Sequence, residues 1–289
     1  MNAMSKLQKA LEKAKEERES TLLELRQLLE NPQDNEDRPA LKLLDTPDRI
    51  TQPADVDEKV DRVSPVYSQS RAVTLNPDVM ERNRCVAMFP NQEEVEAYRV
   101  LRTQILNRTR ETGGNLIMVT SALPGEGKTL TAINLALTFA REYKQTVLLV
   151  DCDLKKQNIH EVMGFESDKG LVDNLLGECS AGDLFVWPAV EKMTLISGGK
   201  TTGESSEMMG SPRMKNLVAD MKHRYPERYI FFDVPPILTG ADALAFAPLM
   251  DHILMVVQAD KTPVGEVNKA AQLLPKEKLL GLVLNRYHA

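Results

Sequence analysis

Cysteines, long apolar runs and an excess of basic residues are all scarce in this chain of 289 residues. The three cysteines are Cys85, Cys152 and Cys179, whose odd number and wide spacing exclude a disulfide scaffold and a zinc module. The longest apolar stretch, residues 243–250, is interrupted by Pro248 and falls short of the roughly 18 residues that a membrane span needs. Lys and Arg number 36 against 42 Asp and Glu, a net charge of −6, so we predict no nucleic-acid partner.

Glycine is absent from the first 112 residues, and all fifteen glycines lie at or beyond Gly113. Tight turns between strands and helices call for glycine, so the turn-rich part of the fold is predicted to begin near residue 113. Ahead of it, leucines at three- and four-residue spacing predict an N-terminal helix within residues 1–31. That helix either docks on another part of the protein by one narrow face or binds a partner. Five prolines and an acidic excess predict that residues 32–70 are a linker without stable structure.

Short apolar runs alternate with stretches of helical periodicity from residue 115 onward. We predict buried strands at residues 115–120, 146–151, 193–196, 229–233, 252–258 and 279–284. Helices are predicted at residues 91–107, 128–143, 207–224, 241–250 and 264–274. Because buried strands that alternate with helices form parallel sheets covered on both faces, the sequence predicts an α/β fold with a mainly parallel sheet flanked by helices.

The first predicted strand leads into a phosphate-binding motif. Residues 122–129, Ala-Leu-Pro-Gly-Glu-Gly-Lys-Thr, fit a Walker A loop with Ala122 at the position of the usual first glycine. Glycines let backbone N–H groups surround phosphate oxygens, and the next helix adds its positive N-terminus. The sequence therefore predicts a P-loop NTPase that binds ATP and Mg²⁺. Its predicted cofactor-binding residues in this loop are Pro124, Gly125, Glu126, Gly127, Lys128, Thr129 and Leu130.

Carboxylates follow two further predicted strands, at the points where a phosphate site would need them. Asp151 ends the second strand and Asp153 lies two residues beyond it, while Asp233 ends the fourth. The carboxyl ends of parallel strands share one edge of a sheet, which is where ligands bind in such folds. An acidic residue after a strand is often only a turn former, but the P-loop makes a shared metal site the better interpretation.

Four separated motifs resemble those of the bacterial tyrosine kinases of capsule and exopolysaccharide synthesis. They are the ExxRxxR motif at 96–102, the Walker A motif at 122–129, the second aspartate motif at 151–154 and the Walker B motif at 232–236. Within that family, the chain resembles the branch tied to exosortase-linked exopolysaccharide loci. It implies that residues 71–289 form a P-loop tyrosine kinase domain.

The resemblance implies a role for each matched residue near the phosphates. Lys128 would clamp the phosphates of ATP. Thr129, Asp153 and Asp233 would hold Mg²⁺. Asp151 would be the base for the incoming tyrosine hydroxyl, or at least its hydrogen-bond acceptor. Together they imply an Mg-ATP-dependent protein-tyrosine autokinase that regulates polymerisation and export of exopolysaccharide or capsule.

The resemblance extends to oligomerisation and to the adenine side of the nucleotide site. Glu96, Arg99 and Arg102 would join neighbouring subunits into a ring-like homo-oligomer. From the residues alone they could equally be a solvated helix face, with ion pairs of about 0.2–0.5 kcal/mol each. Asn285 resembles the asparagine beside the adenine in this family.

The chain departs from the family pattern at its C-terminal end. Members usually phosphorylate a tail crowded with tyrosines, whereas here only Tyr287 follows Tyr229. Tyr287 is therefore the one candidate phosphosite in that tail. The departure leaves open a second function, an ATP-binding and slowly hydrolysing regulatory or scaffold ATPase without tyrosine kinase activity.

Two further comparisons concern partners and a related class. Many family members carry a fused membrane segment, and its absence here implies a separate membrane-embedded activator of the polysaccharide chain-length-determinant type. The protein would then be cytoplasmic, held at the inner face of the plasma membrane through that partner. ParA- and MinD-like ATPases share the fold but carry a signature lysine where this chain has Leu123, which argues against their mechanism.

Overall fold

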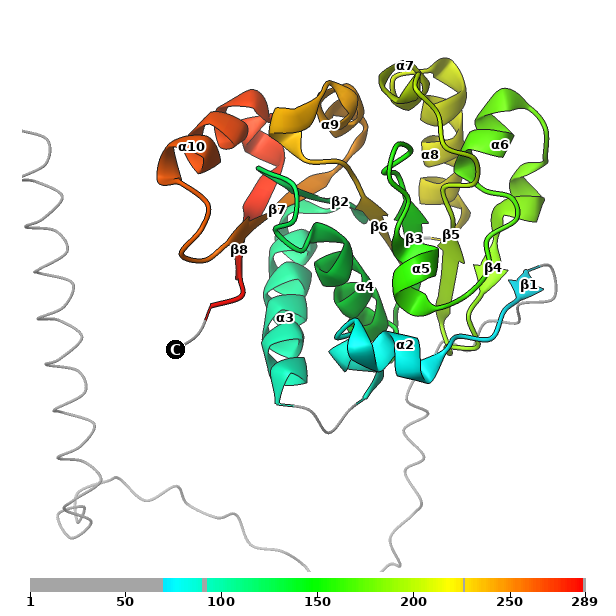
Figure 1. The fold of residues 1–289 in the computed structure, drawn as a ribbon, viewed down its shortest axis with the longest axis horizontal. Coiled ribbons are helices and arrows are strands. Elements are labelled where there is room, and N and C mark those ends of the chain that lie inside the picture. Colours follow the sequence, from blue (N-terminus) through cyan, green and yellow to red (C-terminus); the bar gives the residue numbers. More distant parts are fainter. Residues whose placement is uncertain (1–69, 90–92, 226, 288–289) are drawn as a thin grey trace, which may run out of the picture. The chain divides into compact units, whose positions relative to one another are not determined.

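A computed structural model describes residues 70–89, 93–225 and 227–287 (Figure 1). The predicted N-terminal helix within residues 1–31 and the predicted linker of residues 32–70, except for Ser70, lie outside the described residues. Among the described residues, no helix is both long enough and apolar enough to cross a membrane.

The described residues form an α/β fold around one eight-stranded sheet. In sheet order its strands are β1 (Arg71–Ala72), β4 (Val186–Trp187), β5 (Met193–Ile196), β3 (Thr146–Asp151), β6 (Arg228–Asp233), β2 (Leu116–Ser121), β7 (His252–Gln258) and β8 (Leu279–Asn285). All neighbours are parallel except β4 and β5. The predicted mainly parallel sheet is confirmed, and each predicted strand matches within one residue at either end. The two-residue strands β1 and β4 were not predicted, because two residues carry no periodicity.

Helices cover both faces of the sheet (Figure 1). They are α2 (Pro77–Arg82), α3 (Glu94–Thr112), α4 (Lys128–Phe139), α5 (Ile159–Met163), α6 (Leu171–Leu176), α7 (Ser205–Met209), α8 (Pro212–Arg224), α9 (Asp242–Phe246) and α10 (Val264–Leu273). Short 3-10 turns occupy Val86–Met88, Ala181–Leu184, Ile237–Thr239, Ala247–Leu249 and Lys276–Lys278. Alternate strand residues face opposite layers: Phe231 packs with α3 and α4, and Phe232 packs with α8 and α9.

Four predicted helices have different bounds in the structure. The helix predicted at 91–107 is α3, Glu94–Thr112, which extends five residues further toward the C-terminus. The helix predicted at 207–224 is two helices, α7 and α8, because Ser211 begins a new one: its hydroxyl accepts a hydrogen bond from Met214 N at 3.1 Å, and Pro212 follows it. The helix predicted at 241–250 changes to a 3-10 turn before Pro248. The helix predicted at 128–143 ends at Phe139.

Candidate active site

The P-loop joins the buried strand β2 to the N-terminus of α4. Gly125 and Gly127 have φ angles of 81° and 93°, in the left-handed region that favours glycine. Gly127 is the N-cap of α4, so the loop ends with the first N–H groups of a helix. Such groups bind anions, because they carry the positive end of the helix dipole. The loop geometry therefore fits the predicted phosphate site.

Lys128, the first residue of α4, reaches three other predicted site residues. Its ammonium nitrogen lies 3.0 Å from Asp153 Oδ2, 3.2 Å from Asp233 Oδ1 and 3.3 Å from Thr129 Oγ1. Burial alone would lower the pKa of Lys128, but the charges of Asp233 and Asp153 outweigh it and raise the pKa. The lysine is therefore a buried cation at the meeting point of the residues predicted to hold Mg²⁺.

Thr129 and the two carboxylates supply oxygen atoms at this point. The Thr129 hydroxyl donates to Asp233 Oδ2 at 2.6 Å. No group of three or more His, Cys, Asp and Glu side chains within residues 70–89, 93–225 and 227–287 is arranged to hold a metal by itself. Magnesium is usually bound by one or two carboxylates together with phosphate oxygens and water, so this donor set fits Mg²⁺ when a nucleotide supplies the phosphates.

Asp151 has a different environment from the other two acids. Asp151 and Asp233 lie opposite each other on β3 and β6. Asp151 is fully buried, and its carboxylate accepts backbone hydrogen bonds from Asp153, Asn158 and Ile159 at 3.1–3.2 Å. Burial and the nearby Asp233 raise the pKa of Asp151 to about 7. The Asp151 carboxylate thus binds N–H groups at the start of α5 in addition to lining the site, a structural role that the sequence did not predict.

Comparison with known proteins identifies the family. A family profile described as "AAA domain" matches residues 114–274, more than half of the chain. "Tyrosine-protein kinase YwqD" of Bacillus subtilis is 34% identical over 208 residues, which cover 71% of this chain and 86% of that protein. The chain belongs to the bacterial tyrosine kinase family.

Three further comparisons show how much of this bacterial tyrosine kinase matches other proteins. "Succinoglycan biosynthesis transport protein ExoP" of Rhizobium meliloti is 32% identical over 215 residues, 71% of this chain but only 26% of that longer protein. The kinase domain of Escherichia coli tyrosine kinase ETK superposes with a TM-score of 0.65 at 25% identity, covering 78% of this chain and 93% of that structure. The MinD structure from Pyrococcus horikoshii has a TM-score of 0.51 and covers 59% of the chain. The kinase fold therefore matches more of the chain than the MinD fold does.

The ExxRxxR residues of this bacterial tyrosine kinase do not behave alike. Arg102 binds within its own subunit: its guanidinium lies 2.8 Å from Glu142 Oε1 and donates to Thr138 O at 3.0 Å. Arg99 instead pairs with Glu96, at 3.0 Å, one turn away on α3, and both side chains are exposed. Arg102 thus ties α3 to the end of α4, while Glu96 and Arg99 lie on the surface.

The C-terminal candidates of the kinase lie at the same sheet edge as the P-loop. Asn285 ends β8, and its amide donates to the backbone oxygen of Glu126 at 2.8 Å, so it contacts the P-loop directly. Tyr287 follows two residues later and is 64% exposed. Motif reasoning missed Thr262, which donates to the Glu126 carboxylate from the turn after β7. No sequence signal marks it, because 136 residues separate the two side chains.

Proposed function

We propose that this bacterial tyrosine kinase binds Mg-ATP at its P-loop and transfers the γ-phosphate to tyrosine in a protein of the polysaccharide-assembly machinery, itself included. The observation that carries the site assignment is the contact of Lys128 with Thr129, Asp153 and Asp233. The relative named for succinoglycan biosynthesis supports the choice of polysaccharide assembly.

The residues would divide the work of phosphoryl transfer, which requires mainly positioning and charge neutralisation. The amides of the loop and of the first turn of α4 would hold the phosphates. Lys128 would turn from the two carboxylates toward the phosphate oxygens, which leaves Thr129, Asp153 and Asp233 to hold Mg²⁺. When bound, the metal would neutralise charge that develops on the transferred group.

Asp151 is proposed as the acceptor of the tyrosine hydroxyl proton. A pKa of about 7 suits a general base at neutral pH, because such a group is ionised often enough and still binds a proton well. The Asp151 carboxylate is buried, so the step requires that substrate binding expose one of its oxygens.

The Thr129 hydroxyl provides a matched test of the kinase proposal. Thr129→Val is expected to lower autophosphorylation about 100-fold, the usual effect of removing one group that stabilises the transition state. Thr129→Ser keeps the hydroxyl and should keep most of the activity. Two measurements test this: radiolabel transfer from ATP to the protein, and a phosphotyrosine immunoblot. Each is made with and without EDTA.

The same assay separates the kinase from a regulatory ATPase. ATP hydrolysis without phosphotyrosine on the protein or on an added tyrosine peptide would favour the regulatory or scaffold ATPase. Equal phosphotyrosine signals from Thr129→Val and the wild type would contradict the proposed metal site.

We also propose that a ring-like homo-oligomer forms through Glu96 and Arg99. This oligomer would lie at the cytoplasmic face of the membrane, beside a membrane-embedded chain-length determinant. Arg99→Ala should reduce the particle mass in light scattering and leave the melting temperature within about 2 °C of the wild type, because an exposed ion pair contributes little. Arg102→Ala should instead lower the melting temperature, because its partner Glu142 is partly buried. An unchanged mass for Arg99→Ala would remove Arg99 from the subunit interface.

A further inference from the structure

Glu126 lies inside the P-loop, yet its side chain is 2% exposed. We propose that Glu126 is a positioning residue, which fixes the loop in its phosphate-binding shape by fastening it to the turn after β7. This inference rests on the proposed nucleotide site. It differs from the expectation that Glu126 is itself a ligand of the nucleotide.

The carboxylate closes the loop on one side and ties it to a second segment on the other. Oε2 accepts a hydrogen bond from Leu123 N at 2.7 Å, across the turn that contains Pro124 and Gly125. Oε1 accepts from the Thr262 hydroxyl and, at 3.4 Å, from Gln258 N. Both carboxylate oxygens of Glu126 therefore already accept hydrogen bonds from other residues of the protein.

The main chain of Glu126 is held as well, at the end of β8. Asn285 Nδ2 donates to Glu126 O at 2.8 Å, and the Asn285 side chain fills the space beside Gly127. A Cβ atom at Gly127 would lie only 2.2 Å from that amide nitrogen. Arg286 continues this contact, since its N–H donates to Asn285 Oδ1 at 2.9 Å and its guanidinium to Gln258 Oε1 at 3.3 Å.

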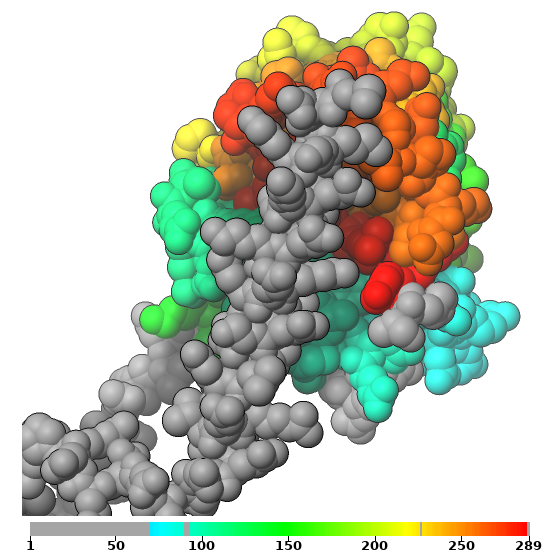
Figure 2. All heavy atoms as spheres, turned by 90° about the vertical axis from the view of Figure 1, so that its left-hand side faces the viewer, coloured from blue at the N-terminus to red at the C-terminus, as the bar shows by residue number. Residues whose placement is uncertain are grey.

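Two of the segments around Glu126 adopt backbone conformations that side chains disfavour. Asp260, in the turn after β7, and Arg286, after β8, have φ angles of 57° and 58°. Non-glycine residues persist in this region when the surrounding structure over-determines them, often at functional sites. Figure 2 views this side of the molecule, where α10 in orange lies next to β8 in red. The network of Glu126 therefore anchors the P-loop to the edge of the sheet formed by β7 and β8.

This arrangement favours phosphate binding because it orders the loop beforehand. A loop that is already held in its bound conformation loses less entropy when the ligand arrives, and so binds more tightly. The carboxylate is hydrogen-bonded to Leu123 N and Thr262, so it is directed into the fold and away from the phosphate-binding face of the loop. In the proposed site the N–H groups of Gly125, Gly127 and Lys128 would bind the anion.

Thr262 allows a conservative test of this role. We expect Thr262→Val, which removes the hydroxyl, to weaken binding of Mg-ADP in titration calorimetry about threefold, and Glu126→Ala about tenfold, in line with the net contribution of a typical protein hydrogen bond. Thr262→Ser and Glu126→Gln should stay within about twofold of the wild type, because serine keeps the donor and glutamine can accept from Leu123 N while it donates to Thr262. Glu111→Ala, at an exposed position on α3, is the control and should bind like the wild type.

The outcomes distinguish this inference from the proposed function. Binding is measured well below the melting temperature of each variant, where a residue that only stabilises the fold would leave the affinity unchanged. Equal affinities for Thr262→Val, Thr262→Ser and the wild type, with Glu126→Ala also unchanged or unable to fold, would overturn the positioning role. Failure of the wild-type protein to bind Mg-ADP would instead reject the nucleotide site itself.

Discussion

Lys128→Met is expected to abolish phosphotyrosine formation, with a decrease of at least about 1,000-fold, because one substitution removes both the phosphate clamp and the cation of the site. Lys128 is the positive charge that lies between two buried carboxylates, at 3.0 Å from Asp153 and 3.2 Å from Asp233. Methionine has similar length and no charge, so the variant changes electrostatics more than packing. Radiolabel transfer from ATP measures the loss.

The same variant should be less stable than the wild type, and the loss should depend on pH. Breaking a buried ion pair by removing one partner costs about 3–5 kcal/mol when the remaining charge stays buried. Burial already raises the pKa of Asp233, and Lys128 opposes that rise, so its removal raises the pKa further. A carboxyl whose folded pKa exceeds its unfolded pKa destabilises the fold above the unfolded pKa, and the cost increases with pH until it levels off above the folded pKa.

Urea denaturation at pH 5 and pH 8 measures this effect. Lys128→Met should lose more of its unfolding free energy at pH 8 than at pH 5, relative to the wild type. Adding Asp153→Asn should recover part of the loss at pH 8, because it removes one of the two uncompensated charges. A loss that is the same at both pH values would show that Lys128 does not compensate these carboxylates in solution.

The parts of this fold that could be predicted from sequence are those fixed by local patterns. The strands β5 and β7 begin and end where predicted, because buried apolar runs are bounded by polar or turn-forming residues. Lys128, Thr129, Asp153 and Asp233 meet because parallel strands place their carboxyl ends at one edge. Element type and site location therefore followed from periodicity and topology.

Contacts between distant segments could not be predicted in this way. The binding of Arg102 to Glu142 depends on the crossing of α3 and α4, which no spacing encodes. The amide donors of Asp151 come from the start of α5, a helix too short to show a period. The separation of α7 from α8 did have a signal, the Ser-Pro pair at 211–212, but the apolar period on both sides concealed it.

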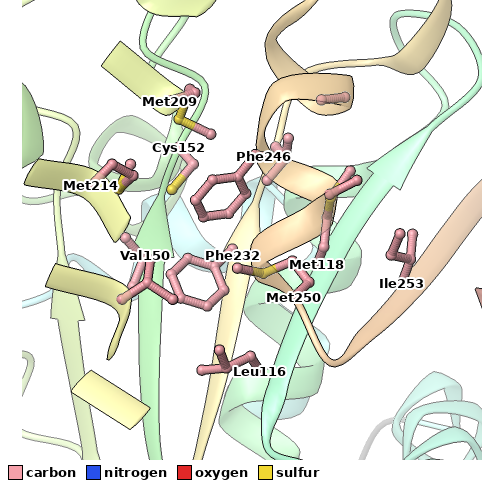
Figure 3. Packing of buried hydrophobic residues seen from close by; sticks show 14 of the residues in the cluster. Leu116, Met118, Val150, Cys152, Met209, Met214, Phe232, Phe246, Met250 and Ile253 are labelled. Carbon is pink, nitrogen blue, oxygen red and sulfur yellow. The ribbon is translucent and has the colours of Figure 1, made fainter. Parts of the chain in front are cut away.

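Phe232→Ala should be the most destabilising of the single substitutions considered in the core. Phe232 is fully buried on β6, directly before Asp233, and its ring lies 5.2 Å from that of Phe246 at 70°, an edge-to-face pair (Figure 3). Truncating a buried phenylalanine costs about 3–5 kcal/mol through lost burial and the cavity that remains. For a domain of this size the melting temperature should fall on the order of 10 °C.

The neighbours of Phe232 determine where in that range the loss should fall. The same cluster contains four methionines, Met118, Met209, Met214 and Met250 (Figure 3). Flexible methionine side chains can move partly into a cavity, so we expect the loss of unfolding free energy to lie in the lower half of the range of about 3–5 kcal/mol. Phe232→Leu, which keeps most of the volume, is the matched control and should lose less than half as much.

Phe246→Ala and the double variant complete a cycle whose coupling should be about 0.5–1.5 kcal/mol, the contribution of an aromatic pair. Additive losses of unfolding free energy would show that the two rings stabilise the protein independently. A fall in melting temperature of less than about 3 °C for Phe232→Ala would show that the apolar layer beneath Asp233 does not depend on this ring.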